Sequence, residues 1–109
     1  MTETWTQRMN KALTHLGETD EDEAKLKTAV ERAKKKMDAE FKIIGSTALG
    51  TVIEKEAAAY RHETYKSSAA AYFTALTEHG KLKNERSTDS ITIDVWRSLN
   101  AARNKGQIV

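Results

Sequence analysis

The segment from His62 to Lys66 starts like the helical zinc-protease motif, in which a His-Glu pair is followed by a second histidine one turn later. Lysine stands at position 66, so the second zinc ligand is missing. His15 and His79 do not have ligand spacing with each other or with His62. The chain also has no cysteine, which excludes disulfides, cysteine-based zinc or iron–sulfur sites and thiol catalysis. We therefore expect no metal site.

Two further patterns with chemical potential also have ordinary interpretations. The segment 45–51 has the glycine spacing of a phosphate-binding loop, but it has no lysine before Thr51 and follows a predicted helix instead of a strand. We interpret it as a turn. Acidic pairs such as Glu54 with Glu56 do not lie within an apolar run, the setting that general acid–base catalysis requires. These patterns predict neither an enzyme nor a cofactor.

Charge is unevenly distributed along the chain, although 18 basic and 16 acidic residues leave a formal net charge of only +2. Residues 1–23 are acidic overall, 24–42 are basic, 43–80 are close to neutral and 81–109 are basic. If the chain doubles back, the two basic segments could form one positive surface. They could equally pair with the acidic N-terminal segment of a neighbouring subunit.

Basic side chains are the best candidates for a binding function, because lysine and arginine neutralise phosphates with a salt-dependent affinity. The candidate nucleic-acid-binding residues are Arg32, Lys34, Lys35, Lys36, Lys81, Lys83, Arg86, Arg97 and Arg103. The competing interpretation is a solvated helix face, since opposite charges one turn apart, such as Glu31 with Lys35, are interspersed.

Aromatic residues offer a second way to hold nucleic acid, because unpaired bases stack on aromatic rings with little regard to sequence. The candidates are Tyr60, Tyr65, Tyr72, Phe73 and Trp96. Tyr65 and Tyr72 are one heptad apart, however, and this spacing is more typical of a packed helix seam. Packing is therefore the preferred role.

Helical periodicity predicts the elements that would position these residues. In the segment 1–17, apolar residues fall on one helix face, and Gly17 is expected to end a short docking helix there. Thr2 or Thr4 would cap its start. Thr19 and the acidic residues after it predict the start of a second helix, over 20–44. Its seam consists of Leu26, Val30, Ala33, Met37, Phe41 and Ile44.

The second half of the chain predicts a short helix over 51–60, capped by Thr51, and a long helix over 63–104. Gly80 shifts or breaks the pattern of the long helix; we prefer a continuous helix, because glycine destabilises a helix interior by only about 1 kcal/mol. The alternation from Ile91 to Val95 resembles a strand, but an isolated strand is marginal. We expect no sheet.

The predicted architecture is a single all-α domain built on a long, antiparallel, coiled-coil-like hairpin of 20–44 against 63–104, with the short helices as accessories. The second arm exceeds the first, and its surplus would expose an apolar stripe containing Ile93 and the candidate interface residues Ile91, Val95, Trp96 and Leu99. This predicts a homo-oligomer. The chain has no predicted membrane span or signal peptide and is expected in the cytoplasm.

Three blocks of the sequence carry a resemblance to a known group of proteins. They are Ile93–Arg103, Lys81–Arg86 and Gly50–Glu56. Together they resemble small helical proteins of tailed bacteriophages and prophages, whose genes often lie near those for DNA recombination and single-strand DNA-binding proteins. The resemblance implies an accessory role in phage DNA metabolism, inside the infected bacterial host. The residues to test first are Trp96, Arg97, Asn100 and Arg103.

The leading functional hypothesis is thus a non-enzymatic oligomer that binds DNA, expected to be single-stranded, or a recombination protein. The alternative is a protein-interaction module, such as a virion assembly or adaptor factor or an inhibitor of a host defence protein. Its exposed 91–99 stripe would then hold a phage or host protein. An enzyme with an unrecognised site is a distant third.

Overall fold

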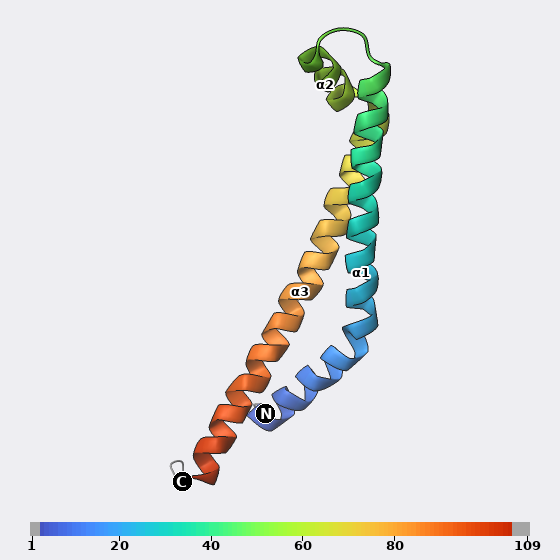
Figure 1. Cartoon of the computed structure of the whole chain (residues 1–109). Helices are drawn as coiled ribbons and strands as arrows, with labels where there is room; N and C mark the ends of the chain where they lie inside the picture. Colours follow the sequence, from blue (N-terminus) through green and yellow to red (C-terminus); the bar gives the residue numbers. More distant parts are fainter. Residues whose placement is uncertain (1–2, 106–109) are drawn as a thin grey trace. The chain divides into compact units, whose positions relative to one another are not determined.

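The computed structural model describes residues 3–105, and in this range it contains three α-helices and no strand. They are α1 (Trp5–Thr47), α2 (Val52–Arg61) and α3 (Glu63–Asn104), in the order that the colours follow in Figure 1. The predicted all-α, hairpin-like fold is confirmed. None of these helices contains an apolar stretch long enough to cross a membrane.

Contacts divide the chain into two compact units. Unit 1 comprises Met1–Glu23 and Lys81–Val109, and therefore contains the first part of α1 and the last part of α3. Unit 2 comprises Ala24–Gly80, with the rest of both long helices and the whole of α2. The expectation of a single domain stays a prediction.

Unit 1 is an antiparallel helix pair with a small core. Met9 and Ala12 on α1 are buried against Ile93 on α3, and Leu16 and Trp96 pack around them. Thr6 on α1 contacts Trp96 on α3, and the later residues Met9 and Ala12 contact the earlier residue Ile93. The first turns of α1 (blue in Figure 1) therefore run antiparallel to the last turns of α3. Apolar packing of a few residues thus holds the first turns of α1 against the last turns of α3.

The predicted helix break at Gly17 is wrong, because α1 continues without interruption to Thr47. Thr19 does not cap a new helix; its hydroxyl donates a hydrogen bond to the His15 carbonyl one turn earlier, at 2.7 Å. Arg86 on α3 binds the Leu16 carbonyl and the Asp20 carboxylate, on either side of Gly17. These contacts stabilise the helix around Gly17, where glycine lowers helix stability by only about 1 kcal/mol relative to alanine.

The predicted surplus of the second arm is also wrong, because the uninterrupted α1 has 43 residues and α3 has 42. The first turns of α1 cover the stripe that was expected to be exposed. Ile93 is only 8% exposed, and Val95, Trp96 and Leu99 are half-buried, whereas Ile91 is 62% exposed. The stripe therefore serves mainly as an intramolecular contact.

In unit 2 the predicted seam is confirmed, since all six of its residues from Leu26 to Ile44 are half-buried. Phe41 on α1 meets Tyr60 on α2 and Tyr65 on α3, with ring centroids 4.9 and 5.5 Å away. Tyr60 and Tyr65 are themselves 5.5 Å apart in an edge-to-face arrangement. The half-buried Tyr65 therefore packs within unit 2, as preferred from its heptad spacing, whereas Tyr60 contacts the same rings but stays 56% exposed.

The turn between α1 and α2 depends on Gly50, which has a φ of +116°. This backbone conformation is strained for any residue with a side chain, so the site needs glycine, and a Cβ there would in addition displace the flexible Glu54 carboxylate. Thr51 then caps α2 by accepting a hydrogen bond from the Glu54 N–H at 3.2 Å, as predicted. Further along, α3 passes through Gly80 as one continuous helix, in agreement with the preferred interpretation.

Candidate functional site

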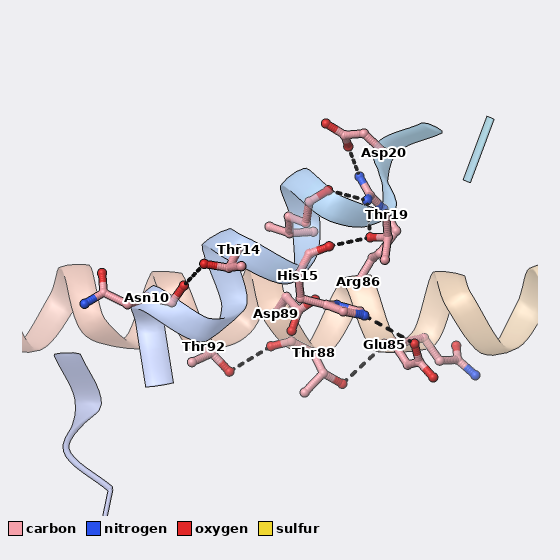
Figure 2. Close-up of polar contacts among 12 residues, drawn as sticks. Asn10, Thr14, His15, Thr19, Asp20, Glu85, Arg86, Thr88, Asp89 and Thr92 are labelled. Atoms are coloured by element: carbon pink, nitrogen blue, oxygen red, sulfur yellow. Dashed lines mark hydrogen bonds and ion pairs between the residues drawn. The ribbon is translucent and has the colours of Figure 1, made fainter. Parts of the chain in front are cut away.

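The polar contacts of unit 1 centre on Arg86, whose guanidinium reaches from α3 across to α1 (Figure 2). Its Nη1 atom donates to the Leu16 carbonyl at 3.0 Å and to the Thr19 hydroxyl at 2.8 Å. Its Nη2 atom donates to the Asp20 carboxylate at 2.6 Å. Arg86 was predicted to hold phosphate, but the structure commits it to joining the two helices, and its side chain is largely buried.

His15 makes a second contact across the helices of unit 1, one turn from Arg86 (Figure 2). Its Nδ1 atom is hydrogen-bonded to the Asp89 carboxylate, and its Nε2 atom lies 3.6 Å from the Glu85 carboxylate. The hydrogen bond that His15 makes to the Asp89 carboxylate raises the pKa of His15. Desolvation lowers this pKa, and the negative charges of Asp89, Glu85 and Glu18 raise it further. A protonated His15 bridges two carboxylates of α3.

Beyond this contact the helices of unit 1 enclose a groove of about 540 Å³, which falls within the roughly 300–1,000 Å³ of typical ligand pockets. Its lining consists of Thr4, Trp5 and Thr6 from α1 and its cap, and of Trp96, Leu99, Asn100 and Arg103 from α3. The groove thus combines apolar rings with an amide and a guanidinium. It requires both helices, so the contacts at His15 and Arg86 help to form it.

The walls of this groove are held in place by local hydrogen bonds. The Trp96 indole N–H donates to the Thr6 hydroxyl at 3.2 Å, across the two helices. Thr4 accepts a hydrogen bond from the Gln7 N–H at 3.1 Å, and the Gln7 side chain accepts one from the Thr4 N–H at 2.9 Å. This reciprocal capping fixes the start of α1, at the predicted cap Thr4; Thr2 lies outside the described residues.

Positive charge prevails around the groove. Arg103 belongs to the lining, and the Arg8 guanidinium lies 4.9 Å from the ring centroid of Trp5. Glu3, which precedes Thr4, forms an ion pair with Lys11, and this hydrogen-bonded partner lowers the pKa of its carboxyl group. The negative charge of Glu3, the residue next to Thr4 in the groove lining, is therefore neutralised by Lys11. The arrangement favours an anionic ligand.

The other predicted basic residues are not brought together in one cluster within either unit. Arg32 and the three lysines 34–36 are exposed on α1 in unit 2. Successive helix residues are about 100° apart around the axis, so these three lysines point in different directions. In unit 1, Lys81 and Lys83 are exposed, and the exposed Arg97 lies 3.8 Å from Asp94. Arg103 is the basic residue that shares the groove with Trp96.

Trp5 was not among the predicted site residues, because its spacing predicts only a place on the apolar face of the 1–17 helix. Its role depends on the antiparallel register of unit 1, which places the first turn of α1 beside Trp96 and Arg103. One signal was present: the chain has two tryptophans, and they lie near its opposite ends. In an antiparallel hairpin with an uninterrupted first helix, Trp5 and Trp96 are expected to lie close together.

A metal centre finds no support in the geometry of residues 3–105. No group of three or more His, Asp or Glu side chains in this range is arranged to hold a metal ion. His62, which begins the motif-like segment, instead accepts a hydrogen bond from the Thr64 N–H at 3.1 Å, at the start of α3.

Comparison of the chain with protein-family models, with curated proteins and with solved structures gives no match. The groove of unit 1 and the exposed basic side chains are therefore the features on which a functional argument rests.

Proposed function

We propose that this chain is a non-enzymatic, oligomeric accessory protein that binds single-stranded DNA during phage recombination or replication, inside the infected bacterium. The observation that supports it is the exposure of the candidate basic side chains. Every one of them except Arg86 is solvent-exposed. Exposed cations can approach phosphates and release counterions, which is the main source of sequence-independent affinity for nucleic acid.

The resemblance of the 50–56, 81–86 and 93–103 segments to phage proteins supports the biological setting. In this setting the protein covers single strands or places a recombination protein on them, without changing the DNA chemically. Repetition of weak contacts in an oligomer would raise the overall affinity, because the second contact becomes intramolecular.

Fluorescence anisotropy of labelled single- and double-stranded oligonucleotides, at several salt concentrations, tests this proposal. We expect saturable binding that is tighter for single strands and weakens steeply with salt. Replacing Lys34, Lys35 and Lys36 together with Gln should reduce the salt slope for single strands by about 0.7 for each of these lysines that contacts a phosphate. Absence of binding at low salt would show that the proposal is wrong.

A matched control separates specific contacts from total charge. Lys42, Lys55 and Lys66 replaced with Gln remove the same charge from other places in unit 2, and Lys66 lies beside Glu63. The control variant should bind more tightly than the 34–36 variant. Equal losses would mean that the 34–36 segment has no special role.

A second function, protein association, is favoured by a different observation in unit 2. The turn and the first residues of α2 expose three large apolar side chains within five residues of the sequence: Leu49 (93%), Val52 (71%) and Ile53 (79%). Contiguous exposed apolar surface is typical of interfaces. We propose that this turn, more than the 91–99 stripe, holds a second copy of the chain. Sedimentation of Val52→Asp with Ile53→Asp should then give a smaller mass than Ile91→Asp.

A further inference from the structure

We propose that the groove of unit 1 is the site where one unpaired nucleotide of a DNA strand is bound. The base would lie against the indole rings of Trp5 and Trp96, Asn100 would bond to the edge of the base, and Arg103 would hold the neighbouring phosphate. This inference rests on the proposed function and identifies the site that would distinguish a single strand from a duplex.

The shape and composition of the groove fit a nucleotide. A cavity of about 540 Å³ can hold a ligand of this size, and the rings of Trp5 and Trp96 offer flat apolar surfaces from opposite helices. Stacking on such rings is available to every base, which gives binding without sequence preference. In a duplex the bases are paired and stacked on each other, so the site would discriminate against double strands.

The groove is also preorganised, which reduces the entropy lost on binding. Trp96 is held by its hydrogen bond to Thr6 and by packing on the core of Met9, Ala12 and Ile93. Trp5 is 40% exposed in the first turn of α1, so part of its ring remains accessible to a ligand.

Charge and polarity decide between a nucleotide and an apolar peptide. Arg103 in the lining and Arg8 beside Trp5 attract a phosphate and repel a basic peptide. An apolar peptide would offer Arg103 only neutral backbone carbonyls, whereas a phosphate offers an anionic acceptor, and hydrogen bonds between ionised partners are roughly twice as strong as neutral ones. A phosphate and a base edge supply both kinds of acceptor.

The chain provides its own reporter for this site, because both of its tryptophans line the groove. Titration with oligothymidylate should quench the intrinsic tryptophan fluorescence, with the same midpoint that anisotropy of the labelled strand gives. Trp5→Phe keeps Trp96 as a single reporter and should still show quenching.

Arg103→Gln tests the phosphate contact with a side chain that is exposed and lies outside the core. Loss of a charge-assisted hydrogen bond should raise Kd for the strand about tenfold. The matched control is Arg61→Gln, which removes the same charge from an exposed residue of α2 that is neither part of the lining nor among the candidate DNA contacts. Circular dichroism should show the same helicity for both variants and the wild type.

The outcomes separate this inference from the broader proposal. Strand binding by anisotropy without tryptophan quenching would overturn the groove as the site and leave DNA binding intact. The same holds if Arg103→Gln and Arg61→Gln bind equally well, or if an apolar peptide quenches the tryptophans while the oligonucleotide does not. If no strand binds at low salt, both proposals are wrong.

Discussion

The Nδ1 atom of His15 is hydrogen-bonded to the Asp89 carboxylate, although 74 residues separate the two in the chain. This contact and the bonds of Arg86 lie just beyond the apolar core of unit 1, on the side away from the groove. They therefore help to keep the first turns of α1 beside α3. A change that weakens them should loosen the groove as well.

The position of His15 predicts a pH dependence. Its pKa is raised in the folded chain above the ordinary value of about 6.5, so it stabilises unit 1 fully below that value. The stabilisation is lost as the pH rises through the raised pKa. Amide hydrogen exchange of residues 5–23, corrected for the intrinsic rate, should therefore show less protection in mildly alkaline than in mildly acidic solution.

Two variants check the assignment to His15. His15→Gln should abolish this pH dependence, whereas His62→Gln, which lies in unit 2, should retain it. Protection that is independent of pH in the wild type would show that protonation of His15 does not hold the helices together.

Arg86 should contribute to stability more than an exposed arginine does. Arg86→Ala removes bonds to Leu16, Thr19 and Asp20, and hydrogen bonds of charged groups contribute about 1.5–3 kcal/mol. Arg97→Ala removes only an exposed pair with Asp94, of the kind that contributes about 0.2–1 kcal/mol. Urea denaturation should thus give a clearly lower free energy of unfolding for the Arg86 variant. Equal values would mean that Arg86 adds nothing beyond surface charge.

Glycine to alanine substitutions should have opposite effects at two positions. Gly50 has a φ of +116°, which strains any residue with a Cβ, so Gly50→Ala should lower the free energy of unfolding by at least about 1 kcal/mol. Gly17 lies within α1, and a Cβ there would meet no other atom within 4 Å. Gly17→Ala should therefore stabilise the protein by about 0.5–1 kcal/mol. Thermal unfolding followed by circular dichroism measures both, and destabilisation by Gly17→Ala would contradict an uninterrupted α1.

Periodicity alone was enough to predict much of the fold. The seam from Leu26 to Ile44 is half-buried throughout, because a helix that packs on one side must repeat its apolar residues every 3.6 positions. The same argument predicted α2 with its cap Thr51, and α3 through Gly80. These features depend on neighbours within a few turns.

The break predicted at Gly17 failed because the deciding contacts are distant. Glycine, threonine and aspartate are stop and start signals of about 1 kcal/mol, and the bonds from Arg86, some 70 residues away, outweigh them. The same error hid the groove. A helix that ends at Gly17 does not predict the register that places Trp5 beside Trp96 in one groove. It also does not predict that Arg86 binds α1, so Arg86 remained a candidate phosphate contact.

The corrected register makes a sharp distinction between Ile91 and Ile93, which the sequence placed in the same exposed stripe. Ile93 is 8% exposed in the core with Met9 and Ala12, whereas Ile91 is 62% exposed. Ile93→Ala should lower the free energy of unfolding by about 2–4 kcal/mol, because it leaves a cavity in a small core. Ile91→Ala should change it by no more than about 0.5 kcal/mol. Denaturant unfolding at several protein concentrations provides the comparison, since an interface at Ile91 would make its effect depend on concentration. A larger loss for Ile91→Ala than for Ile93→Ala would restore the stripe as a surface between chains and overturn the antiparallel register of unit 1.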